Sequence, residues 1–258
     1  MISVIHLGTI DYATGLRLQQ RLVELRKEAR IGDVLLLLEH TPVITLGRNA
    51  KEKNIVASPQ LLVERGVEVS ECDRGGDVTF HGPGQLVGYP IFDLRGFPAH
   101  DGKRKTLGVI EYVRRLEEVL IRTCADYRIP SKRIAGLTGV WTENNPEAKI
   151  AALGVHISRG VTSHGVALNV NTDLSFFNLI IPCGIESKPV TSIEKELEKK
   201  VPLEEVANSV SRNFGQVFES QMLWLESLDA LLEQNVGVPL RTPKELQRIR
   251  GEDDTAWA

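Results

Sequence analysis

Residues 149–170 read KIAALGVHISRGVTSHGVALNV, and this stretch decides the fold. Its two halves, Lys149 to Ile157 and Val161 to Val170, have the character of β-strands. The residues between them, Ser158-Arg159-Gly160, have the length and the glycine of a hairpin turn. We therefore predict two neighbouring antiparallel strands at the centre of the molecule.

Segments on both sides of this hairpin extend the pattern. Further strands are predicted at 34–38, 43–46, 77–80 and 86–92. Apolar residues at helical spacing predict three helices. The first has the stripe Leu18, Leu22, Leu25 and Ala29, and the second has Ile110, Val113, Leu120 and Cys124. The third begins at Pro202 and has the stripe Val206, Val210, Phe214 and Val217. Because strands and helices do not alternate one for one, the predicted class is α+β: a mixed, largely antiparallel sheet with packed helices.

The end of the chain differs in composition from the rest. Leu225, Leu228 and Leu232 have helical spacing, and prolines and acidic residues follow them. We predict one domain over residues 1–220, and a peripheral helix with a poorly ordered tail over residues 221–258.

The composition excludes several classes of function. The 258 residues carry a formal net charge of −3, which gives no reason to expect nucleic-acid binding. The apolar run Val34 to Leu38 is too short to span a membrane, and the first residues do not resemble a signal peptide. The chain has three cysteines, which do not form a disulfide framework. We expect a cytoplasmic protein in a reducing compartment, with no membrane partner.

Residues 74–85 form a glycine-rich segment that can approach a ligand closely or simply form a tight turn. The spacing of its glycines does not match the dinucleotide pattern, and no phosphate-binding Gly-Lys-Ser/Thr is present. The six histidines show no metal-ligand spacing. We therefore expect neither a bound metal nor a nucleotide cofactor.

Cys183 lies in the turn Pro182-Cys183-Gly184, where a sharply bent backbone exposes a thiol. A thiol reacts as thiolate, and its ordinary pKa of about 8.5 must be lowered by a nearby cation. Lys149 is the candidate cation, and the pair suggests acyl transfer through a thioester. The alternatives are an inert turn for Cys183 and a solvated strand end for Lys149, whereas Cys72 and Cys124 are interpreted as structural.

Five ordered segments together resemble the octanoyltransferase family of lipoate biosynthesis. They extend over residues 39–48, 74–85, 149–154, 164–171 and 181–184, and with their flanks the resemblance covers about residues 5 to 217. It implies a fold similar to the catalytic domains of biotin and lipoate protein ligases. It also makes residues 1–220 the catalytic domain.

The resemblance also implies roles for particular residues. Cys183 would be the acyl-thioester nucleophile, and Lys149 would lower its pKa and move protons. The acyl pocket and reaction centre would be lined by Arg74, Gly75, Gly76, Asp77, Val78, Thr79, Phe80, His81, Ala152, Leu153, Gly154, Gly165, Val166 and Ala167.

The implied reaction moves an octanoyl or lipoyl group from acyl carrier protein to a lysine of a lipoyl domain, without ATP or metal. The implied acceptors are the lipoyl domains of 2-oxoacid dehydrogenase complexes and the glycine cleavage H protein. Three alternatives remain open: an ATP-dependent lipoate–protein ligase, an amidotransferase acting between lipoyl-bearing proteins, and a catalytically silent acyl-binding protein.

Overall fold

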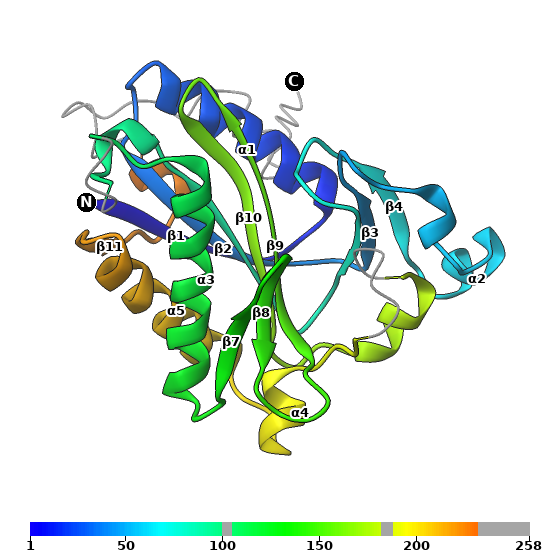
Figure 1. Cartoon of the computed structure of the whole chain (residues 1–258). Coiled ribbons are helices and arrows are strands. Elements are labelled where there is room, and N and C mark those ends of the chain that lie inside the picture. Colours follow the sequence, from blue (N-terminus) through cyan, green and yellow to red (C-terminus); the bar gives the residue numbers. More distant parts are fainter. Residues whose placement is uncertain (100–104, 182–187, 232–258) are drawn as a thin grey trace, which may run out of the picture.

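The computed structural model describes residues 1–99, 105–181 and 188–231. These residues form a large sheet and a small sheet (Figure 1). The large sheet has the strand order β11-β1-β2-β6-β10-β9-β8-β7. Its strands are β1 (Ile2–Ile10), β2 (Asp33–His40), β6 (Gln85–Ile91), β7 (Ser131–Ile134), β8 (Leu137–Thr142), β9 (Lys149–Ser158), β10 (Val161–Asn169) and β11 (Met222–Trp224).

The small sheet stands beside the large one and has the order β4-β3-β5. Its strands are β3 (Val43–Leu46), β4 (Glu68–Glu71) and β5 (Val78–His81). The helices are α1 (Tyr12–Lys27), α2 (Pro59–Glu64), α3 (Val109–Asp126), α4 (Ile193–Leu197) and α5 (Leu203–Val217), with 3₁₀ turns at Glu52–Asn54, Leu94–Gly96 and Leu174–Leu179.

The predicted hairpin is confirmed. β9 and β10 pair antiparallel around Arg159 and Gly160, both of which have positive φ. Of the strand pairs described in the large sheet, β1–β2 and β1–β11 are parallel and the others antiparallel, so the sheet is mixed and largely antiparallel. The predicted fold class is therefore correct.

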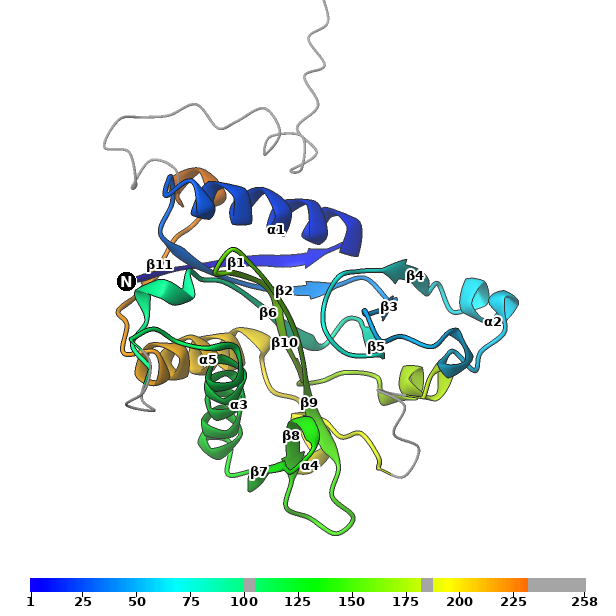
Figure 2. The same cartoon turned by 45° about the horizontal axis from the view of Figure 1, so that its top comes forward.

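Helices cover both faces of the large sheet. Figure 2 shows α1 on one face and α3 and α5 on the other. Alternation along the strands explains this division, because successive side chains point to opposite faces. Leu36 and Leu38 join the cluster under α1, whereas Leu35 and Leu37 join the cluster under α3 and α5.

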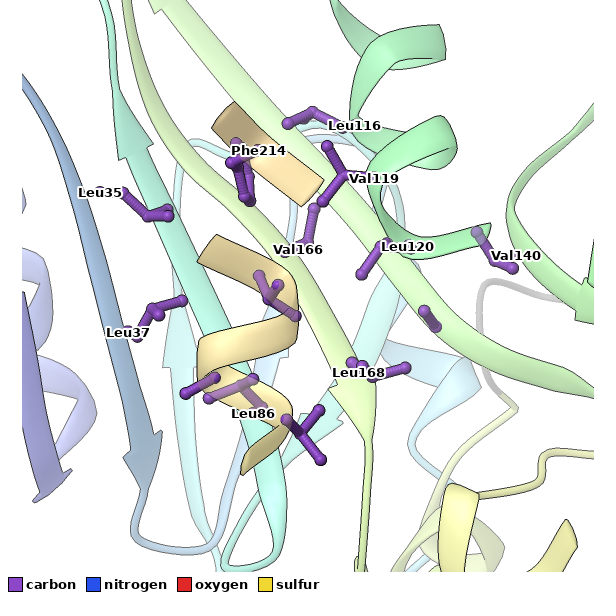
Figure 3. Packing of buried hydrophobic residues seen from close by; sticks show 14 of the residues in the cluster. Leu35, Leu37, Leu86, Leu116, Val119, Leu120, Val140, Val166, Leu168 and Phe214 are labelled. Atoms are coloured by element: carbon purple, nitrogen blue, oxygen red, sulfur yellow. The ribbon is translucent and has the colours of Figure 1, made fainter. Parts of the chain in front are cut away.

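The second of these clusters is the larger core (Figure 3). Leu116, Val119 and Leu120 of α3 and Phe214 of α5 meet side chains of β2, β6 and β10 there. Burial of such side chains stabilises a fold by about 1.5–3 kcal/mol each. Ile150 and Ala151 of β9 and Val166 and Leu168 of β10 belong to this core, which therefore positions both strands.

Two predicted helical stripes need correction. α1 begins after Asp11, whose Oδ1 accepts a 2.8 Å hydrogen bond from Thr14 N, and it ends before Ala29, which has φ 56°. In α3, Leu120 and Cys124 of the predicted stripe are confirmed as buried, but Ile110 is 76% exposed, and Tyr112 and Leu116 complete the buried face. The stripe of α5 is confirmed for Val206, Val210 and Phe214; Pro202 is its N-cap, and Val217 is partly buried.

The sequence did not predict a strand beyond residue 220. β11 pairs parallel with β1 through Ile2↔Met222, Ser3↔Leu223 and Val4↔Trp224. Leu225 and Leu228 are buried in the cluster under α1, and a helix begins at Leu228. The division of the chain at residue 220 stays a prediction, and the predicted tail lies outside the described residues from 232 onward.

Candidate active site

A cavity lies between the glycine-rich segment and the three central strands β6, β10 and β9. The space between its lining atoms, which includes the open solvent at its mouth, is about 470 Å³. Its wall consists of Tyr12, Arg74, Gly76, Asp77, Thr79, His81, Val87, Tyr89, Ala152, Leu153, Gly154, His164, Gly165, Val166 and Ala167.

Small residues on β9 and β10 make room for this cavity. Ala152 lies opposite Ala167, and Gly154 lies opposite Gly165, in the register of the antiparallel pair. Residues two apart on a strand point to the same face, so these four form one continuous patch. A row of short apolar side chains on a rigid sheet can accommodate a flexible apolar chain.

Arg74 closes one side of the cavity and is itself buried. Its guanidinium donates to Thr45 Oγ1 at 3.1 and 2.8 Å, to Thr45 O at 2.7 Å and to Gly75 O at 3.1 Å. Gly154 allows this segment to lie directly on β9, because an added Cβ would come within 2.8 Å of Gly75 O. Gly75 also donates from its N–H to Val155 O, at 3.0 Å.

Alternation along β5 divides the predicted binding residues. Thr79 and His81 face the cavity, whereas Val78 and Phe80 belong to the cluster of the small sheet and do not line it. Gly75 is likewise absent from the cavity wall, although its neighbours Arg74 and Gly76 form part of it. Placing the whole segment in the wall overlooked the two-residue period of a strand.

Asp77 fixes the other end of the glycine-rich segment. Its carboxylate accepts hydrogen bonds from Lys51 N at 3.1 Å, from Asn54 Nδ2 at 2.5 Å and from its neighbour Val78 N at 2.8 Å. Asn54 O in turn accepts from Ile181 N at 2.7 Å. The cavity wall is thereby connected to the chain just before residue 182.

The polar side of the cavity contains buried histidines. His40 Nδ1 donates to Ile10 O at 3.0 Å, so its Nε2 accepts from Tyr89 OH at 2.7 Å. Burial lowers the pKa of His40 to about 4 and that of His81 to about 3. Both imidazoles are therefore neutral near pH 7.

His164 is paired with a carboxylate. Its Nε2 donates to Asp73 Oδ1 at 2.7 Å, and its backbone has φ 54°, a left-handed conformation unusual for a residue other than glycine. Burial lowers the pKa of His164 against the opposing effect of Asp73. Burial alone would raise the pKa of Asp73, but the hydrogen bond and charge of His164 lower it.

Lys149 is buried at the first position of β9, and its exposed fraction is 7%. Its Nζ lies 5.1 Å from the centroid of the Trp141 ring, and a Cβ on Gly139 would come within 2.6 Å of its Cε. The interpretation of Lys149 as a solvated strand end is therefore wrong. Lys149 does not line the cavity, but it begins the strand that carries Ala152 and Gly154.

Cys183 lies outside the described residues. On one side the description ends at Ile181, which is bonded to Asn54, and on the other Pro189 O accepts from Lys149 N at 2.8 Å. The other two cysteines are described. Cys124 is fully buried in the core, where burial raises the pKa of its thiol to about 12, and Cys72 Sγ contacts Leu46 O at 3.4 Å.

Four residues of the wall, Tyr12, Val87, Tyr89 and His164, are absent from the set that the resemblance implied. Val87 and Tyr89 could have been found by extending the alternation of β6 toward its partner β10. Tyr12 carries no such signal, since it approaches from the first turn of a helix remote in sequence.

The described part of the chain contains neither a cluster suited to a metal nor a helix that could span a membrane. No group of three or more His, Cys, Asp or Glu side chains suited to a metal is found within it. None of its helices combines the length and apolar character that crossing a membrane requires.

Residues 11–215 match the family model of the lipoyl protein ligase A/B catalytic domain. A protein of Koribacter versatilis called octanoyltransferase is 62% identical over 253 residues, covering 98% of both chains. An octanoyltransferase of Acidobacterium capsulatum is 58% identical over 239 residues, covering 91% of this chain and 97% of the relative.

This chain belongs to the octanoyltransferase family. It is accordingly an acyltransferase that moves an octanoyl group in protein lipoylation. Solved lipoate protein ligases share the fold. The bipartite enzyme from Thermoplasma acidophilum superimposes with a TM-score of 0.69 at 16% identity, covering 98% of this chain and 92% of the other. A lipoate-protein ligase A bound with ATP gives the same TM-score at 15% identity.

Proposed function

We propose that this octanoyltransferase takes its acyl group from acyl carrier protein and passes it to a lysine of a lipoyl domain through a thioester on Cys183. The observation that carries the proposal is the cavity of short apolar side chains on β9 and β10, with buried Lys149 at the start of β9. The octanoyl chain would lie along Ala152, Gly154, Gly165 and Ala167.

In the first step the Cys183 thiolate attacks the thioester carbon of the donor. The tetrahedral intermediate collapses with loss of the phosphopantetheine sulfur, which leaves as a thiol after taking a proton from the Lys149 ammonium. In the second step the neutral amine of the acceptor lysine attacks the Cys183 thioester. Lys149 takes up the proton released by the amine, and the amide product leaves with Cys183 restored as thiolate.

The surroundings of Lys149 support this assignment. Trp141 and Gly139 hold the long side chain from one side, so the ammonium needs little further ordering before it acts. Conversion of a thioester into an amide is energetically downhill, so neither ATP nor a metal is proposed as a participant. The proposed acceptors are the lipoyl domains of 2-oxoacid dehydrogenase complexes and the glycine cleavage H protein.

Intact-protein mass spectrometry tests the proposal. The purified chain is mixed with octanoyl-acyl carrier protein without ATP, and we expect a gain of one octanoyl group that disappears when a lipoyl domain is added. Cys183→Ala should abolish the adduct, whereas Cys72→Ala, as the matched control, should keep it. An adduct of undiminished yield on Cys183→Ala would refute the nucleophile assignment.

Lys149→Ala and ATP dependence test the remaining parts. Lys149→Ala should fold, acylate slowly and react faster as the pH rises, because more of the cysteine is then thiolate. If wild type modifies the lipoyl domain only with free octanoate and ATP, the activity is that of a ligase and the proposed donor is wrong.

A further inference from the structure

A chain of buried hydrogen bonds connects His81 in the cavity wall with the backbone beside Lys149. His81 Nδ1 lies 2.7 Å from Gln85 Oε1, and Gln85 Nε2 lies 2.9 Å from Asn169 Oδ1. Asn169 Nδ2 lies 2.9 Å from Thr191 O, and Thr191 N donates to Lys149 O at 2.9 Å. All five residues are buried.

The direction of every bond in this chain is determined. Thr191 O can only accept, so Asn169 presents its NH₂ group there and its carbonyl oxygen to Gln85. Gln85 Nε2 donates to that oxygen and, at 3.2 Å, to Phe80 O, which also can only accept. Gln85 Oε1 must therefore accept, and the proton of His81 must be on Nδ1.

This tautomer leaves a lone pair on His81 Nε2. Among the described residues no group donates a hydrogen bond to Nε2, while His81 forms part of the cavity wall. The ring is kept neutral by burial and by the groups that face it from neighbouring elements, which are His40, Arg74 and His164. Tyr12 stacks on the ring, with centroids 6.3 Å apart.

We propose that Gln85 and Asn169 are positioning residues that hold His81 so that its Nε2 accepts a hydrogen bond from an N–H group of the substrate. The inference rests on the proposed function, in which acyl transfer takes place at this cavity. The octanoyl group has no hydrogen-bond donor. The N–H group comes either from an amide of the phosphopantetheine arm or from the amine of the acceptor lysine.

His81 acts here as an acceptor and not as a general base. A base with a pKa of about 3 holds an abstracted proton too weakly to compete near pH 7, where an effective general base has a pKa close to the working pH. Its neutral lone pair, in contrast, orients a donor without taking the proton. The role assigned to Lys149 in proton transfer is unaffected.

Nitrogen-15 NMR of the histidine side chains tests the tautomer in the wild-type protein without any substrate. Long-range couplings between ring nitrogens and ring carbon-bound protons distinguish the two neutral forms, and His81→Asn identifies the His81 signals among the six histidines. We expect a neutral ring with Nδ1–H from pH 8 down to pH 5. A ring with Nε2–H, or one that gains a proton near pH 6.5, would overturn the inference.

Gln85→Glu tests the consequence for the reaction. A carboxylate beside Nδ1–H favours the imidazolium, which has a proton on Nε2 and can no longer accept. The substitution also removes the bonds that Gln85 Nε2 donates to Phe80 O and Asn169 Oδ1, so the ring loses its fixed orientation as well. We expect kcat/KM to fall about tenfold at pH 7, equivalent to about 1.4 kcal/mol, and to recover as the pH rises. Asn171→Asp is the matched control, since this amide bonds to Val201 and has no contact with His81.

The two half-reactions distinguish the sources of the N–H group. Slower octanoyl-enzyme formation from octanoyl-pantetheine in Gln85→Glu identifies the pantetheine amide, and slower transfer to the lipoyl domain identifies the lysine amine. Unchanged rates in both, with the NMR signals showing a protonated ring, would overturn the role of Nε2. Failure of wild type to form an octanoyl-enzyme would refute the proposed function instead, while the NMR result would stand.

Discussion

Gly165→Ala should destabilise the protein by forcing the two central strands apart. An added Cβ at this position would lie 2.3 Å from Gly88 O and 2.5 Å from Pro90 Cδ, both on β6. Real Cβ atoms essentially never approach closer than 3.0 Å, so the strands must separate locally by at least 0.7 Å (3.0 − 2.3). The neighbouring pair Val166↔Gly88 lies at the centre of the sheet, where the backbone has no room to relax.

Overpacking of this kind typically costs about 1–3 kcal/mol, and backbone contacts on a central strand place Gly165→Ala near the upper value. For a chain of this size about 3 kcal/mol corresponds to a decrease in Tm of roughly 6–12 °C. Octanoyl transfer should fall as well, because Gly165 belongs to the cavity wall.

The assay is thermal unfolding followed by circular dichroism, with Gly96→Ala as the control. At Gly96 an added Cβ meets nothing within 4 Å, and φ is not positive, so Tm should change little. A Tm for Gly165→Ala equal to that of the control would refute the packing argument.

Three further changes give separate tests. Ala167→Leu should fill the cavity and shift the preference of the enzyme from octanoyl to shorter acyl thioesters. Relative transfer rates measure this preference, and an unchanged preference would show that the acyl chain does not lie along Ala167. Burial lowers the pKa of His40 from about 6.5 in the unfolded chain to about 4 in the folded protein. At pH values between these two pKa values, the His40 ring is protonated in the unfolded state but not in the folded state. Stability should therefore decrease as pH falls from about 6.5 to about 4, and His40→Gln should flatten this dependence of Tm on pH. Glu117→Gln should lower the free energy of unfolding by about 1–2 kcal/mol, because the fully buried carboxylate accepts hydrogen bonds from Gly139 N and from Arg133. Chemical denaturation measures this difference, and an unchanged denaturant midpoint would contradict the prediction.

The fold could be predicted largely because its hairpin is local. Strand alternation over Lys149 to Val170, with a short turn at Gly160, specifies both strands and their pairing. The buried face of α3 was predicted in part. Leu120 and Cys124 of the predicted stripe are fully buried, whereas Ile110 is 76% exposed. Tyr112 and Leu116, which the stripe omitted, are also fully buried, and the tertiary arrangement selects them.

Part of the cavity wall agrees with the residues that the family resemblance implied. Arg74, Ala152 and Gly165 are among them, and all three line the cavity. Tyr12 comes from a helix whose position over β10 no local pattern specifies. Gln85 was overlooked because its role depends on two partners. Its side-chain amide bonds to His81, four residues away, and to Asn169, 84 residues away, and only the folded register brings Asn169 close.

The position of β11 beside β1 has a consequence for synthesis of the chain on the ribosome. β1 precedes every other described strand of the large sheet in the chain, yet within the described residues its outer edge pairs with residues 221–225, more than 200 positions later. Until those residues emerge, the edge presents unpaired N–H and C=O groups, which can recruit strands of other nascent chains. A chaperone that shields this edge would therefore be needed until these residues emerge, and a chain terminated at residue 220 would lack the strand that covers the edge.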